Sequence, residues 1–124
     1  MADTLLLQLV STERVLVEEQ VTEVQVPAKD GFLGVLPGHA PLLSELKPGG
    51  VLTYQVGGKQ KVLAVYGGFV EVLPDRVRVL ADAAQHKEEI DINDARAVLA
   101  RAIAAAELDE MMRAQARVDA ALIP

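Results

Sequence analysis

Residues 51–80, VLTYQVGGKQKVLAVYGGFVEVLPDRVRVL, contain four short runs of β-branched, aromatic and leucine residues that are separated by turn signals. The runs are Val51–Val56, Val62–Tyr66, Phe69–Leu73 and Val77–Leu80, and the turn signals are Gly57-Gly58, Gly67-Gly68 and Pro74-Asp75. Such runs favour strands, and Gly57-Gly58 predicts a two-residue hairpin turn because glycine adopts positive φ without a steric penalty. The segment therefore predicts consecutive β-strands joined by tight turns.

The residues before this segment alternate between apolar and polar positions, which is typical of half-buried strands. The alternating apolar positions are Leu5-Leu7-Leu9, Val15-Val17 and Val24-Val26. With the later runs, they predict eight to ten short strands within the first 85 residues. An antiparallel sandwich or a flattened barrel accommodates so many closely spaced strands, and we favour the sandwich.

Backbone preference divides the chain near residue 85. All nine glycines, five of the six prolines and fifteen of the seventeen valines lie in residues 1–85, whereas residues 86–124 contain eleven alanines. Valine with frequent turn signals favours strands, and alanine without helix breakers favours helix. We therefore expect a β domain over residues 1–85, followed by a helical tail over residues 86–124.

The apolar positions of the tail repeat at intervals of three and four residues, as on one face of a helix. They are Ile92, Ala95, Leu99, Ala102 and Ala106, and a second set restarts with Leu108, Met111, Met112, Val118 and Leu122. Leu108 lies about 200° from Ala106 around a helix, so the two sets suit an antiparallel hairpin if the chain turns near Ala106–Asp109, and periodicity alone does not choose between this state and a continuous helix. No glycine or proline interrupts Ile92–Ile123, so a single long helix stays open as an alternative.

The first apolar face of the tail is mostly alanine, and each buried methyl group contributes little at about 25 cal/mol per Å². Such a hairpin is expected to dock weakly and to behave as a mobile element. A hairpin that stays docked without switching is the alternative.

Composition excludes several classes of function. The net charge of −6 and the four aromatic residues, Phe32, Tyr54, Tyr66 and Phe69, argue against a nucleic-acid-binding surface. With no cysteine, the chain has no disulfides, no thiolate chemistry and no zinc site of the usual spacing. Its longest uncharged run, Gly31–Ser44, contains three glycines and two prolines, so we expect no membrane insertion. The first residues, Met1-Ala2-Asp3, lack the basic region of a secretory signal.

The sequence shows no recognisable catalytic motif. His39 and Ser44 lie five residues apart, but no G-x-S-x-G nucleophile elbow surrounds the serine, so we expect a loop histidine that bonds to backbone groups. His86, at the domain junction, is expected to be solvent-exposed. Gly58-Lys59 lacks the earlier glycine of a phosphate-binding loop because Thr53 stands in its place. We therefore expect no catalytic residues and no metal site, as in a non-catalytic interaction module; a hydrolase using His39 and Ser44 is the other class considered.

Two motifs resemble those of a known family. Residues 30–44, DGFLGVLPGHAPLLS, and residues 66–72, YGGFVEV, are similar to the two signatures of the epsilon subunit of F-type ATP synthases. The resemblance implies a ten-stranded antiparallel β-sandwich followed by a two-helix antiparallel hairpin. It also implies a non-catalytic rotor subunit of the central stalk, which couples rotation of the ring to ATP synthesis in the catalytic head. The implied location is peripheral, on the cytoplasmic face of the bacterial plasma membrane.

The same resemblance implies where partners bind. The sandwich would hold the gamma subunit and rest on the proteolipid c-subunit ring, with Gly31, Phe32 and Gly34 facing the ring and His39 and Ser44 near gamma. The helices could extend along gamma, contact the catalytic beta and alpha subunits and block ATP hydrolysis.

Some members of the family bind ATP between the two helices through a motif of the form [IL]-D-x-x-R-A. The corresponding residues here are Ile92, Asn93, Arg96 and Ala97, together with Arg113 and Arg117 near the C-terminus. Asparagine replaces the motif's aspartate, and loss of its charge predicts weak or absent ATP binding. No other cofactor is expected. The alternative function is an ATP-sensing regulatory module, and the two arginines could equally face the catalytic head.

Overall fold

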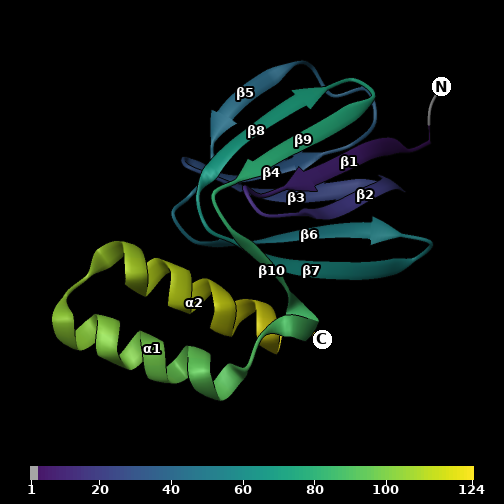
Figure 1. Ribbon diagram of the computed structural model, residues 1–124. Helices are drawn as coiled ribbons and strands as arrows, with labels where there is room; N and C mark the ends of the chain where they lie inside the picture. Colours follow the sequence, from purple (N-terminus) through teal and green to yellow (C-terminus); the bar gives the residue numbers. More distant parts are fainter. Residues whose placement is uncertain (1–2) are drawn as a thin grey trace.

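The computed structural model describes residues 3–124, which form ten strands, a short 3₁₀ helix and two α-helices (Figure 1). The strands are β1 (Leu5–Val10), β2 (Val15–Val21), β3 (Glu23–Ala28), β4 (Gly31–Val35), β5 (Leu42–Glu45), β6 (Gly50–Val56), β7 (Lys59–Val65), β8 (Gly68–Leu73), β9 (Arg76–Ala81) and β10 (Ala84–His86). The helices are η1 (Lys87–Glu89), α1 (Ile92–Ala105) and α2 (Leu108–Leu122).

The strands form two five-stranded sheets, with the orders β2-β1-β9-β8-β5 and β10-β7-β6-β3-β4. The predicted ten-stranded sandwich with a helical hairpin is therefore confirmed. Seven of the eight strand pairings are antiparallel, and the exception is the parallel pairing of β1 with β9, from Leu6↔Arg76 to Val10↔Leu80. Local turn signals do not indicate this pair, because it joins the two ends of the β domain.

Alternation along each strand fills the space between the two sheets. Leu5, Leu7 and Leu9 of β1 are fully buried, as their spacing predicts. The second sheet is covered on both sides at β7: Leu63 and Val65 face the sandwich core, whereas the neighbouring positions on this strand pack against the helices. One sheet thus carries the main core on its inner face and the helical hairpin on its outer face.

The Gly57-Gly58 turn has the predicted form. Both residues have positive φ, 57° and 78°, and the flanking Val56 and Lys59 pair across the hairpin. Two consecutive positive φ values define the tight turn that matches the twist of the adjoining strands.

The tail forms a hairpin, so the single long helix is not the state of this structure. Asp91 caps α1, where its carboxylate accepts from the backbone N–H groups of Asn93 and Asp94 at 3.0 and 3.2 Å. The helix ends at Ala106, which has left-handed backbone angles of 55° and 37°, within the predicted turn region. Ala106 is the only non-glycine residue with positive φ in residues 3–124. This geometry costs an L-residue about 1 kcal/mol or more.

The hairpin docks through α2, which packs against β6 and β7, while α1 packs on α2 (Figure 1). Ala95 and Ala102 of the predicted α1 face are buried, but Leu108 and Leu122 of the predicted α2 face are exposed. Val118 of the predicted α2 face is buried as expected, and the other buried positions of α2 are Ala114, Ala116 and Ala120. Small side chains allow the helix to approach the sheet closely, so the choice of large apolar residues identified Val118 but missed the three alanines.

The expected boundary between residues 85 and 86 falls within β10, and independent folding of residues 1–85 stays a prediction.

Candidate functional site

The ring- and gamma-facing residues implied by the resemblance lie where the edges of the two sheets meet. β4 is the last strand of one sheet and β5 is the last strand of the other. Between them lies a cavity of about 370 Å³, and Gly31, Phe32 and Ser44 are among its lining residues. The structure thus brings these three predicted residues together, whereas Gly34 and His39 lie outside the cavity lining.

This end of the sandwich exposes large apolar side chains. Phe32 and Leu43 are 68% and 70% exposed, and Leu42 is also exposed. The Lys47 ammonium lies 5.7 Å from the centroid of the Phe32 ring, a cation–π geometry that leaves the other side of the ring free. A cluster of exposed apolar side chains in a soluble domain is typical of an interaction surface. We name Phe32, Leu42 and Leu43 the edge patch.

His39 and Ser44 do not form a hydrolytic pair. The Nδ1 of His39 lies 2.7 Å from the carbonyl oxygen of Ala40, which is the backbone contact expected of a loop histidine. The hydroxyl of Ser44 donates to the carbonyl oxygen of Glu45 at 3.1 Å. Neither side chain is oriented by the other, so the geometry lacks the nucleophile–base contact of a hydrolase.

The residues of the expected nucleotide motif separate into two groups. Arg113 and Arg117 line a second cavity of about 190 Å³ between α2, α1 and the sheet. Asn93, Arg96 and Ala97 are exposed on α1, Ile92 is half-buried, and none of the four lines this cavity. Pockets that bind organic ligands usually enclose about 300 to 1,000 Å³, so this cavity is too small for ATP in the docked hairpin.

Arg117 has a carboxylate partner that the sequence analysis did not identify. Its Nη2 lies 3.0 Å from Oδ2 of Asp94, and its side chain is only 17% exposed. The Nε atoms of Arg113 and Arg117 are buried without a hydrogen-bond partner among the described residues. The local spacing does not indicate whether residue 93 or residue 94 of α1 faces α2. The rotation of the two helices relative to each other determines this, and it places Asp94 against Arg117.

Tyr66 and Gln85 complete the wall of the same cavity. The Tyr66 hydroxyl donates to Oε1 of Gln85 at 2.7 Å. Burial raises the pKa of Tyr66 to about 12, while the charge of Arg117 acts in the opposite direction. The phenol is therefore neutral near pH 7, and the cationic groups in this cavity are the two arginines.

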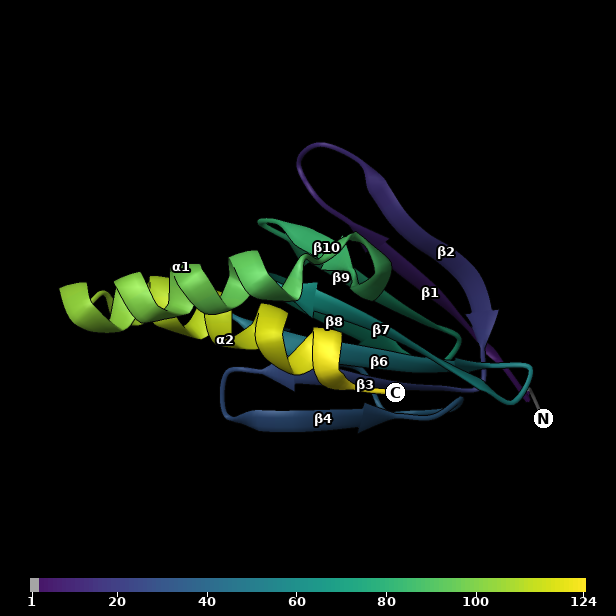
Figure 2. The same ribbon diagram turned by 90° about the horizontal axis from the view of Figure 1, so that it is seen from below.

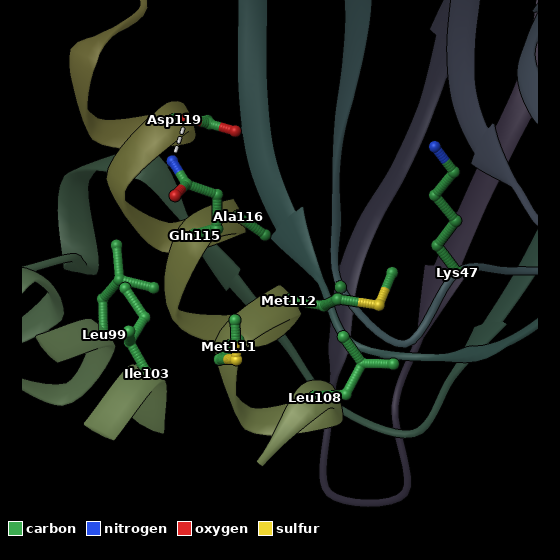
Figure 3. A pocket seen from close by; sticks show the side chains of 10 residues that line it. Lys47, Leu99, Ile103, Leu108, Met111, Met112, Gln115, Ala116 and Asp119 are labelled. Atoms are coloured by element: carbon green, nitrogen blue, oxygen red, sulfur yellow. Dashed lines mark hydrogen bonds between the residues drawn. The ribbon is translucent and has the colours of Figure 1, made fainter. Parts of the chain in front are cut away.

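A third, apolar cavity lies between the two helices and the loop before β6, and its lining extends along α2 from Leu108 beside the turn to Asp119 (Figure 3). Its volume is about 340 Å³, and Leu99, Ile103, Met111 and Met112 line it. Gln115 donates to Asp119 at 2.8 Å beside it. The cavity thus lies beside the contact of α2 with the sheet, because Ala116 both lines it and packs against β7.

The linker between the two domains is held at several points. Both terminal nitrogens of Arg14 lie 2.9 Å from the carboxylate of Glu89, and the backbone N–H of His86 donates to the same carboxylate at 2.8 Å. These bonds, led by those from Arg14, lower the pKa of Glu89 to about 2. The Lys87 ammonium donates to the carbonyl oxygens of Ala121 and Ile123 and so caps the C-terminal end of α2.

The environment of His86 differs from the expected exposure. Its ring is half-buried, and Nε2 lies 3.1 Å from the carbonyl oxygen of Leu16 in β2. The difference arises because β10 and η1 fold back onto the start of β2, a long-range contact that local sequence does not indicate.

No helix within residues 3–124 is long and apolar enough to span a bilayer. Within the same range, no three His, Asp or Glu side chains converge as metal ligands.

Comparison with known proteins places these features in a family. Residues 4–87 match the family described as "ATP synthase, Delta/Epsilon chain, beta-sandwich domain". The ATP synthase epsilon chain of Solibacter usitatus is 62% identical over 101 residues, covering 82% of this chain and 75% of the relative. The epsilon chain of Koribacter versatilis is 45% identical over 102 residues, covering 82% and 71%.

Solved structures agree with this assignment. A chain from the mitochondrial ATP synthase of Euglena gracilis, in a structure of OSCP, F1 and the c-ring, superposes with a TM-score of 0.80 at 28% identity, covering 99% of this chain and 84% of that chain. A chain from the central stalk and c-ring of the Tetrahymena thermophila enzyme shares the fold, with a TM-score of 0.65 at 12% identity over 92% of this chain and 96% of that chain. The resemblance found in the two sequence motifs is thus confirmed, and the chain belongs to the ATP synthase epsilon chain family.

Proposed function

We propose that this chain works as a non-catalytic rotor subunit that couples rotation of the proteolipid c-subunit ring to ATP synthesis in the catalytic head. The observation that carries the proposal is the edge patch, an exposed apolar surface on a rigid sandwich in a member of the epsilon chain family. Gly31, Phe32 and Gly34 face the ring in this proposal, and His39 and Ser44 lie near gamma. The proposal implies a peripheral location on the cytoplasmic face of the bacterial plasma membrane.

Site-directed cross-linking within the assembled enzyme tests this orientation. The chain contains no cysteine, so Phe32→Cys and His39→Cys each introduce one thiol at a known place. Phe32→Cys should cross-link to the ring and His39→Cys to gamma, whereas Val15→Cys, an exposed position on β2, should give neither product. If Val15→Cys cross-linked to the ring and Phe32→Cys did not, the proposed orientation would be wrong.

The coupling role has its own test. Phe32→Ser removes the aromatic ring of the edge patch without disturbing the core, because the Phe32 side chain is largely exposed. We expect weaker retention of the subunit in the purified complex and less ATP-driven proton pumping. Val15→Ser is the matched control. Val15 is similarly exposed at 62%, but it lies on β2, at the edge of the other sheet that is farthest from β5. Equal pumping by both variants would contradict the proposal.

The tail supports a second, regulatory function. Its turn residue has an unfavourable backbone conformation, its contact with the sheet is built largely from alanine, and the turn end borders a cavity of about 340 Å³. Each feature lowers the cost of opening the hairpin. In the open state the helices would reach the catalytic beta and alpha subunits and inhibit ATP hydrolysis. ATP sensing by the tail is the alternative, and we propose that ATP binding is weak or absent because Asp94 already occupies Arg117.

A further inference from the structure

Strand β4 has one side without a hydrogen-bonding neighbour. It pairs only with β3 and ends the order of its sheet, and Figure 2 shows it at the rim with no strand beyond it. An unpaired strand edge is a template for a further strand, and proteins usually protect such edges with charged residues or proline. The sequence of β4, Gly-Phe-Leu-Gly-Val, contains neither.

The pairing on the other side of β3 determines which groups of β4 are free. The N–H of Lys47 donates to the Pro27 carbonyl at 3.0 Å, and the N–H of Lys29 donates to the Glu45 carbonyl at 2.9 Å. The backbone groups of Pro27 therefore point away from β4. Because hydrogen bonding alternates along an antiparallel strand, the residue opposite Pro27, Phe32, also points its N–H and C=O away from β3.

The same reasoning applies two residues later. Gln25 pairs with Gly34, so the N–H and C=O of Gly34 also face the open edge. The alternate residues Gly31, Leu33 and Val35 direct their groups to β3. The open edge thus presents two donors and two acceptors, from Phe32 and Gly34, on either side of Leu33.

We propose that two copies of the free chain associate by antiparallel pairing of β4 with itself, centred on Leu33. In this register Phe32 of one copy lies opposite Gly34 of the other, and the two residues exchange both of their free hydrogen bonds. The twofold axis repeats the exchange, so all four free groups of each edge are paired. The arrangement continues the sheet through both copies.

The side chains suit this register. Phe32 and Gly34 lie on the outer face of the sheet, whereas Leu33 points toward the sandwich core. The exposed ring of Phe32 would therefore cover the opposite glycine, a cross-strand combination known to stabilise sheets that contain glycine. The neighbouring Leu42 and Leu43 line a cavity together with Phe32 and extend the apolar surface beside the axis.

The alternative registers pair fewer of the free backbone N–H and C=O groups within the strand. Centring the pair on Phe32 sets Gly34 opposite Asp30, which precedes the strand and carries a charge. Centring it on Gly34 sets Phe32 opposite Leu36, which lies beyond the end of β4. Only pairing about Leu33 keeps both exchanging pairs within the strand.

The dimer is expected to be weak and to strengthen with salt. One added strand pair buries well under the area of about 1,200 Å² at which stable interfaces begin. Each copy also carries a net charge of −6, and salt screens the repulsion between the two copies.

If the proposed function is right, the dimer also hides the residues proposed to face the ring, so self-association and assembly exclude each other. Only this consequence depends on the proposed function.

Sedimentation equilibrium of the isolated full chain tests the proposal. Between about 10 μM and about 1 mM, the apparent mass should rise from 13.3 kDa toward twice that value, and the rise should be larger in high salt. Phe32→Lys should abolish the rise, because it removes the ring and charges the edge. Phe69→Lys is the matched control, since Phe69 is also exposed but lies on β8, inside its sheet, and it should dimerise like the unmodified chain. A chain that stays monomeric throughout, or equal behaviour of both variants, would overturn the proposal without affecting the rotor function.

A cysteine variant tests the register. In the Leu33-centred pair, the two Leu33 residues face each other at a non-hydrogen-bonded position, where opposing Cβ atoms lie about 5 Å apart. Leu33→Cys should therefore form a disulfide-linked dimer under mild oxidation. Leu36→Cys, which is more exposed and lies away from the axis, should link more slowly. Faster linking of Leu36→Cys would show a different contact and overturn the proposed pairing.

Discussion

The guanidinium of Arg117 on α2 lies 3.0 Å from the carboxylate of Asp94 on α1, so one ion pair crosses the helical hairpin near the linker. The arginine side chain is 17% exposed and the aspartate side chain is 57% exposed. This pair joins the two helices at the end opposite the turn at Ala106. It also holds Arg117 in the absence of any ligand.

Replacing Asp94 with asparagine should loosen the hairpin. The change removes the charged acceptor and leaves the partly buried Arg117 without its counterion, which costs about 1 kcal/mol. Urea unfolding should therefore report lower stability for Asp94→Asn. The control is Asp30→Asn, which makes the same change of charge in an exposed turn of the sandwich. Equal midpoints for the two variants would mean that the ion pair contributes nothing.

Replacing Ala106 with glycine should stabilise the hairpin. Glycine adopts the left-handed conformation without the penalty of about 1 kcal/mol that alanine incurs, so the isolated protein should gain about that stability. Ala104→Gly is the matched control, because Ala104 lies inside α1 and glycine there costs up to about 1 kcal/mol. The two variants should change the thermal midpoint in opposite directions, and a decrease in both would contradict the assigned turn.

Ala106→Gly also tests the inhibitory tail in the whole enzyme. Glycine at position 106 favours the hairpin over a continuous helix in two ways. It removes the backbone penalty that alanine incurs at the turn, and it destabilises the continuous helix, so the two effects together shift the equilibrium by about 2 kcal/mol. If the extended tail inhibits, Ala106→Gly should raise ATP hydrolysis above that of the unmodified enzyme. Hydrolysis that stays unchanged would argue against inhibition by extension.

Gly49 is required for the close approach of α2 to the sheet. A Cβ atom at this position would lie 2.4 Å from the carbonyl oxygen of Met112, and backbone atoms cannot move aside cheaply. Gly49→Ala should therefore displace α2, destabilise the protein by about 1 to 3 kcal/mol and speed hydrogen exchange of α2 amides. In Gly34→Ala, the added Cβ would meet only the flexible end of Gln25, so exchange in α2 should not change.

Local patterns predicted the β domain well because the alternation of apolar and polar residues along a strand indicates which of its faces is buried. The alternation of Leu5, Leu7 and Leu9, and the glycine pair after Val56, depend only on neighbouring residues. The parallel pairing of β1 with β9 depends on segments at opposite ends of the domain, so no local signal indicates it. The buried face of α2 was predicted only at Val118 for a similar reason, since its alanines are buried by close approach to β7 rather than by their own hydrophobicity.

The candidate sites depend in the same way on contacts between segments that are distant in the sequence. Phe32 was named as a site residue only through the family resemblance, and the free backbone groups beside it are evident only from the order of strands. Asp94 pairs with Arg117 because of the relative rotation of two helices, and Lys87 caps α2 because the linker folds back. Neither contact has a signal in spacing along the chain.

The stability of the linker should depend on pH through Glu89. Its pKa in the folded chain is lowered from 4.5 to about 2, so the Arg14 contact stabilises the protein above pH 4.5, and this contribution is lost as the pH falls toward 2. Glu89→Gln should be less stable than the unmodified chain at pH 7, and the difference in thermal midpoint should shrink across that window. Glu88→Gln, at the neighbouring position in η1, is the matched control and should leave the thermal midpoint at pH 7 unchanged, because Arg14 bonds to Glu89.

ATP binding to the isolated chain should be weak or absent, and the structure suggests how it could be improved. Asn93 and Arg96 are exposed on α1, Arg117 is held by Asp94, and the cavity between the helices is about 190 Å³. A nucleotide would therefore have to break the Asp94–Arg117 pair and open the hairpin. Asn93→Asp restores the charged acceptor of the family motif, and a gain of about 1.4 kcal/mol would raise affinity tenfold. Calorimetric titration with ATP should show tighter binding for Asn93→Asp than for the unmodified chain. Micromolar binding by the unmodified chain that Asn93→Asp does not improve would refute both the weak-binding prediction and the role given to position 93.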